Sequence, residues 1–106
     1  LQNNIKDFSG YSDKVAFSLA AYNAGAGLIK KAIQKTGKTD PSWEEVKVEI
    51  TEDLVAEAYS KSFKPSVYSE HFGTKEKRNR KVREVQNYVA LLLNYYYAYE
   101  QAIEKE

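Results

Sequence analysis

The chain has 106 residues, of which 42% are hydrophobic and 29% charged, with Gly 5 and Pro 2. This composition indicates one ordered, helix-leaning domain and excludes a linker or a repeat array. The formal net charge of +1 excludes a whole-molecule field that would attract nucleic acid or an anionic membrane. Without cysteine, and with His71 as its single histidine, the chain cannot form disulfides or zinc sites with nitrogen and sulfur ligands, and we expect no metal and no cofactor.

Residues 1–12 are predicted to form a leading loop, because they are mostly polar and contain a Ser-Gly breaker. Ser12 or Asp13 can cap the helix that follows. No apolar run approaches the roughly 20 residues that span a bilayer, so we expect no membrane span. The start at Leu1 lacks Met and a secretory pattern, which we interpret as the start of a fragment or a processed product.

Residues 13–37 are predicted to form a helix-turn-helix pair. Val15, Leu19 and Tyr22 recur at helical spacing and give the first helix one apolar stripe. The Asn-Ala-Gly-Ala-Gly segment after Tyr22 is expected to stop this helix in a tight turn, because glycine adopts backbone angles closed to other residues. A second short helix is expected to end at Gly37.

Residues 38–80 are predicted to form a helical and irregular connection. Ser42 and Glu45 have the spacing of a capping box, which predicts a short helix followed by an extended stretch. Thr51 can cap a further helix, which is expected to end before the next proline. Residues 60–74 are expected to be irregular.

Residues 81–106 are predicted to form a long C-terminal helix, and the fold class is therefore all-α. Apolar residues recur there at alternating steps of three and four, the spacing of a continuous core-facing stripe. The stripe consists of Val82, Val85, Val89, Leu92, Tyr96, Tyr99 and Ile103.

Two short segments resemble the signatures of one enzyme family. Residues 20–25 read A-A-Y-N-A-G and residues 84–89 read E-V-Q-N-Y-V. They resemble the A-Y-N-A-G and E-T-x-x-Y-V motifs of the soluble lytic transglycosylase (SLT) family, whose domain has the goose-type lysozyme fold. The chain departs from the family at Ala26, where proline is common, at Val85, where threonine is usual, and in a longer connection between the motifs.

The resemblance implies the C-terminal half of a lysozyme-like domain that cleaves the MurNAc-GlcNAc β-1,4 bond of peptidoglycan and leaves a 1,6-anhydromuramyl product. It implies that Tyr22, Asn23, Glu84 and Tyr88 line the groove for the glycan strand. These residue types suit that task, because sugars require flat apolar faces together with dense hydrogen bonding. The alternatives are that Tyr22 is a core residue, that Asn23 only ends a helix, and that Glu84 and Tyr88 are an exposed pair.

The family's catalytic glutamic acid protonates the glycosidic oxygen and then acts as a base. It lies in an E-S context upstream of a G-L-M-Q-like segment, and both precede A-Y-N-A-G. Neither occurs in residues 1–19. The resemblance therefore implies a catalytic Glu upstream of Leu1, in a missing N-terminal half-domain, and an inactive isolated chain. It also implies a cell-envelope, periplasmic or phage-virion location.

Two other functions remain open from the residues. The basic run at 75–83 can contact phosphates, which would make the chain a nucleic-acid-binding module. The balanced net charge and the lack of a nucleic-acid motif argue against it. Alternatively, the chain is a noncatalytic cell-wall or protein-interaction module whose partner surface consists of Tyr95, Tyr96, Tyr97 and Tyr99.

Overall fold

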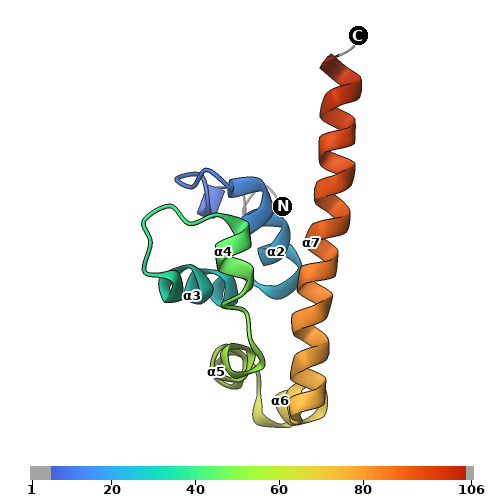
Figure 1. Ribbon diagram of the computed structural model, residues 1–106. Helices are drawn as coiled ribbons and strands as arrows, with labels where there is room; N and C mark the ends of the chain where they lie inside the picture. The colour runs from blue at the N-terminus through green and yellow to red at the C-terminus, as the bar shows by residue number, and fades with distance from the viewer. Residues whose placement is uncertain (1–5, 105–106) are drawn as a thin grey trace.

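The computed structural model describes residues 6–104, and every regular element in that range is helical (Figure 1). The all-α prediction is therefore confirmed for this part of the chain, whereas the predictions for residues 1–5 and 105–106 lie outside it. The helices in chain order are α2 (Lys14–Ala24), α3 (Ala26–Thr36), α4 (Trp43–Lys47), α5 (Glu52–Ser62), α6 (Pro65–Phe72) and α7 (Lys75–Glu104).

Helix α2 packs against both α3 and α7. The prediction of one apolar stripe on α2 does not account for all of its buried residues. Phe17 and Ser18, which lie off that stripe, are buried, while Tyr22, which lies on it, is exposed. The alanines of α2 are also buried and allow the neighbouring helices to approach closely. A helix covered on several sides does not show the simple pattern of a surface helix.

The leading-loop prediction for residues 1–12 is wrong at the start of the described range. Lys6 and Asp7 are helical, and the side chain of Phe8 is fully buried. Its ring packs edge-on against Phe17, with the ring centroids 6.0 Å apart. The segment is therefore ordered by aromatic packing, which adds to the core beyond the area that it buries.

Asp13 occupies the N-cap position of α2, but its side chain does not cap that helix. Instead, Asp13 Oδ2 accepts a hydrogen bond of 2.6 Å from the backbone N–H of Trp43, the first residue of α4. One carboxylate thus ties the start of α2 to the start of α4, and it lies where an anion is favoured by the N-terminal end of a helix.

The glycine turn between α2 and α3 is confirmed. Gly25 has φ 93° and separates the two helices, and Gly37 has φ 68° in the left-handed conformation after α3. Both values favour glycine over residues with a side chain. In the last turn of α2 before Gly25, Tyr22 is exposed whereas Ala24 is buried.

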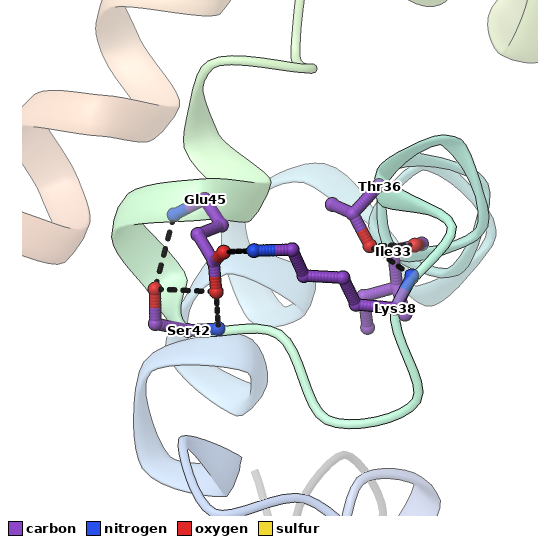
Figure 2. Close-up of polar contacts among 5 residues, drawn as sticks. All are labelled: Ile33, Thr36, Lys38, Ser42 and Glu45. Carbon is purple, nitrogen blue, oxygen red and sulfur yellow. Dashed lines mark hydrogen bonds and ion pairs between the residues drawn. The ribbon is translucent and has the colours of Figure 1, made fainter.

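The capping box before α4 is also confirmed (Figure 2). The backbone N–H of Glu45 donates to Ser42 Oγ at 3.2 Å, and the backbone N–H of Ser42 donates to Glu45 Oε1 at 2.9 Å. Lys38 of the preceding loop forms an ion pair with the other carboxylate oxygen of Glu45. Together these contacts stabilise a helix of only 5 residues.

Replacing Ser42 by alanine is expected to destabilise the protein by about 1 kcal/mol, because it removes the acceptor for the N–H of Glu45. Urea unfolding followed by circular dichroism measures the change. Ser69→Ala is the matched control, because Ser69 is an exposed serine within α6, and it should change stability by less than about 0.5 kcal/mol. Equal effects of the two substitutions would contradict the role of the capping box.

The prediction that residues 60–74 are irregular is wrong, because they include α6. Thr51 caps α5 as predicted, accepting from the N–H of Leu54 at 3.3 Å, and α5 ends at Ser62, before the proline. Pro65 does not break a helix here; it stands in the first turn of α6, where the missing N–H costs nothing and the fixed φ is already helical.

Helix α7 begins at Lys75 and not at about Lys81. Thr74 provides the start, because its hydroxyl accepts a hydrogen bond of 3.2 Å from the N–H of Lys77. The 30 residues of α7 make a helix about 45 Å long, close to the longest dimension of the molecule, 51 Å. It packs against α2, α5 and α6, and its second half extends past the other helices (Figure 1).

The core-facing stripe of α7 is confirmed only in part. Val85 and Val89 are fully buried. Beyond them the same spacing continues on a helix that leaves the domain, and Tyr96, Tyr99 and Ile103 are exposed. Among the described residues, no helix has the length and apolar character that crossing a membrane requires.

Candidate functional site

The last turn of α2 and the middle of α7 meet at the surface, and they bring the two sequence motifs together. Tyr22 is 62% exposed, and its ring stacks on that of Tyr88, with centroids 6.5 Å apart and planes 19° from parallel. Tyr88 is half-buried against the core. The alternative that Tyr22 is a core residue is therefore wrong.

Asn23 and Glu84 are joined by a residue that the sequence did not single out, Lys81. The Lys81 ammonium donates to the backbone carbonyl of Asn23 at 3.2 Å and to Glu84 Oε2 at 2.5 Å. The four predicted residues thus lie around one place, where α2 ends against α7. Lys81 lies one helical turn before Glu84, and this spacing in the sequence could have predicted that the two side chains pair.

The side chain of Asn23 contributes an unpaired acceptor at this place. Its Oδ1 atom is buried and has no hydrogen-bond partner among the described residues. Because buried polar atoms are usually hydrogen-bonded, an unpaired one costs about 1–3 kcal/mol. This atom marks a position at which an additional donor would be stabilising.

Tyr59 of α5 contacts the end of α2 next to the site, and no sequence motif indicates this role. Its hydroxyl donates a hydrogen bond of 2.7 Å to the carbonyl of Ala24, at the end of α2. Burial, and secondly the charge of Glu84, raise the pKa of Tyr59 to about 12. The ring also packs edge-on against Phe63 and Phe72. Tyr59 therefore fixes the end of α2 relative to α5.

Replacing Tyr59 by phenylalanine is expected to cost about 1–2 kcal/mol at pH 7, because the carbonyl of Ala24 loses its partner. The loss should shrink as pH rises from 10 to 12. The folded pKa, about 12, exceeds the reference value of 10.0, so the phenol ionises first in the unfolded chain and the wild type loses stability across this window. Urea unfolding at pH 7 and about pH 11 measures both effects, with Tyr99→Phe as the control. A cost that does not change with pH would contradict the raised pKa.

A pocket of about 270 Å³ adjoins Glu84 between α6 and α7. Its lining is mainly basic and consists of His71, Phe72, Lys77, Arg80, Lys81 and Glu84. The basic run at 75–83 does not, however, form a uniform phosphate-binding stripe. Arg78 pairs with Glu52 at 2.7 Å and donates to the carbonyl of Phe72 at 2.9 Å. Several cations of the run thus make contacts within the protein.

The carboxyl groups whose pKa is shifted do not resemble a general acid, which requires a raised pKa. A hydrogen bond from Arg78 lowers the pKa of Glu52. Hydrogen bonds from the hydroxyl and the N–H of Ser12 lower that of Asp40. The Glu84 side chain is 53% exposed and pairs with Lys81. Glu84 therefore does not lie in the apolar pocket that would raise the pKa of a general acid. In residues 6–104 no group of three or more His, Cys, Asp or Glu residues is placed to hold a metal ion.

No protein family, curated protein or solved structure matches the chain.

Proposed function

We propose that this chain contributes the substrate-groove side of a lytic transglycosylase-type, lysozyme-like domain that cleaves peptidoglycan. One observation carries the proposal: Tyr22 and Asn23, and Glu84 with Tyr88, come from motifs far apart in the sequence and meet at one exposed place. A shared substrate groove requires that the two motifs converge in this way.

The arrangement suits a glycan strand. Tyr22 offers an exposed aromatic face for the apolar face of a sugar ring. Beside it, the ammonium of Lys81 and the carboxylate of Glu84 supply donors and acceptors for hydroxyl and acetamido groups. In this proposal the four motif residues position the substrate, and none of them is the proton donor.

We also propose that the catalytic glutamic acid belongs to an N-terminal half-domain that packs on the second half of α7. The apolar stripe of α7 continues from the buried Val85 and Val89 to the exposed Tyr96 and Tyr99, and contiguous exposed apolar patches mark interaction sites. A pocket of about 350 Å³, partly lined by Leu93, Tyr96 and Tyr97, lies where α7 leaves the domain.

Co-sedimentation with purified murein sacculi tests the proposal, with duplex DNA and cellulose as comparison ligands. We expect the chain to bind sacculi in preference to both, and to release no 1,6-anhydromuropeptides by itself. Failure to bind sacculi would overturn the groove assignment. Release of anhydromuropeptides would overturn the assignment of the acid to another segment, and preferential binding of DNA would favour the nucleic-acid alternative.

A further inference from the structure

The basic pocket between α6 and α7 has features of a binding site for an anion. Phe72 supplies an apolar wall, and Lys77, Arg80 and Lys81 supply cations around a volume of about 270 Å³. Against these cations the lining holds a single carboxylate, that of Glu84. The lining therefore has an excess of positive charge, although the net charge of the chain is only +1.

The contacts of the cations leave part of this charge uncompensated. The Lys77 ammonium donates to the carbonyl of Glu70 at 2.6 Å, which is a neutral partner. Arg80 lies 3.7 Å from the nearest carboxylate oxygen of Glu76, and both side chains are largely exposed. That distance exceeds a hydrogen bond, so the guanidinium still has donors for the planar, bidentate recognition of a carboxylate.

The pocket adjoins the residues of the proposed glycan groove. Glu84 lines the pocket and also pairs with Lys81, and Lys81 bonds the carbonyl of Asn23. A ligand that lies along Tyr22 and Asn23 would therefore reach the pocket with a side branch. Because Glu84 lies among the cations, the branch must bind next to one negative charge. A group with a carboxylate beside an amine or amide fits this arrangement better than a polyphosphate does.

We propose that this pocket binds a carboxylate of the peptides that peptidoglycan glycan strands carry. The inference rests on the proposed function and adds a specificity to it: the groove holds the sugars, and the pocket recognises whether the strand is substituted by peptide. Arg80 and Lys77 bind the peptide carboxylate, and Glu84 accepts hydrogen bonds from neighbouring amide or amino groups.

Isothermal titration of the 106-residue chain with two ligands tests the inference: a muropeptide that contains the disaccharide and its peptide, and the same disaccharide without peptide. We expect the muropeptide to bind about tenfold more tightly. Arg80→Gln and Lys77→Gln should each reduce this preference about three- to fivefold, as expected for partly exposed ion pairs. Arg83→Gln is the matched control, because Arg83 lies on the same helix and is exposed but does not line the pocket. Raising the salt to about 0.5 M should reduce the preference as well.

Each outcome decides between the two proposals. Equal binding of the two ligands, or an equal effect of Arg80→Gln and Arg83→Gln, would overturn the carboxylate pocket while the glycan groove remains supported. If neither ligand binds, the groove proposal fails and the inference fails with it. Binding of a DNA oligonucleotide that depends on Arg80 and Lys77 would instead assign the pocket to phosphates and overturn the inference.

Discussion

Replacing Tyr22 by alanine is expected to weaken binding to murein glycan about ten- to a hundredfold. The tyrosine offers the exposed ring face of the proposed groove, and the loss of one aromatic stacking partner corresponds to about 1.5–3 kcal/mol of binding free energy. Binding to sacculi and to a soluble disaccharide both report the change. The same variant should lose affinity for muropeptide and for peptide-free glycan by the same factor, because the pocket residues Lys77 and Arg80 are unchanged.

The fold should tolerate this substitution. Because Tyr22 is 62% exposed and its main contact is the ring of Tyr88, the free energy of unfolding is expected to fall by no more than about 1 kcal/mol. Tyr99→Ala is the matched control, since Tyr99 is an equally exposed helical tyrosine, at 67%, in the second half of α7. The groove assignment would fail if Tyr22→Ala retained wild-type affinity, or if Tyr99→Ala lowered the affinity equally.

Replacing Val89 by aspartate is expected to destabilise the protein by about 3–5 kcal/mol, a large part of the stability of a small domain. Val89 is fully buried on the face of α7 that packs in the core, so the carboxylate would lose its hydration without gaining a partner. Tyr99→Asp changes the same stripe where it is exposed and should cost less than about 1 kcal/mol. Thermal unfolding followed by circular dichroism distinguishes them.

This pair of variants tests where the domain ends along α7. A large loss of stability in Tyr99→Asp would show that the second half of α7 is packed in the protein as it exists in solution. A small loss in Val89→Asp would show that the first half of α7 is not packed in the core. It would then contradict the packing of α7 on α2 that brings Tyr22 and Tyr88 together.

The local signals in the sequence predicted the elements whose causes are themselves local. The glycines after α2 and α3, the Ser42 and Glu45 capping box, and the cap at Thr51 are confirmed. Each depends on one residue's backbone freedom or on a side chain that reaches a few residues along the chain. The error at α6 has the same kind of cause, because the prediction uses Pro65 only as the end of a helix, whereas proline also starts helices.

The meeting of the two motifs was expected from the resemblance, but the residues that join and support them were not. Lys81 bridges Asn23 and Glu84, and Tyr59 supports Ala24. The sequence patterns use Lys81 only as the predicted start of the last helix, and they assign no role to Tyr59. Contacts of this kind link segments far apart in the chain, and neither periodicity nor spacing within one helix contains that information.

The sequence by itself determined that this chain is helical, where α2, α3 and α5 begin and end, and which residues of α7 share a face. Only the tertiary structure decided that Tyr22 is exposed while Phe17 and Ser18 are buried, and that the stripe of α7 is core at Val89 but surface at Tyr99. The physical reason is that spacing specifies which side chains lie on one side of a helix, whereas burial depends on which other helices reach that side.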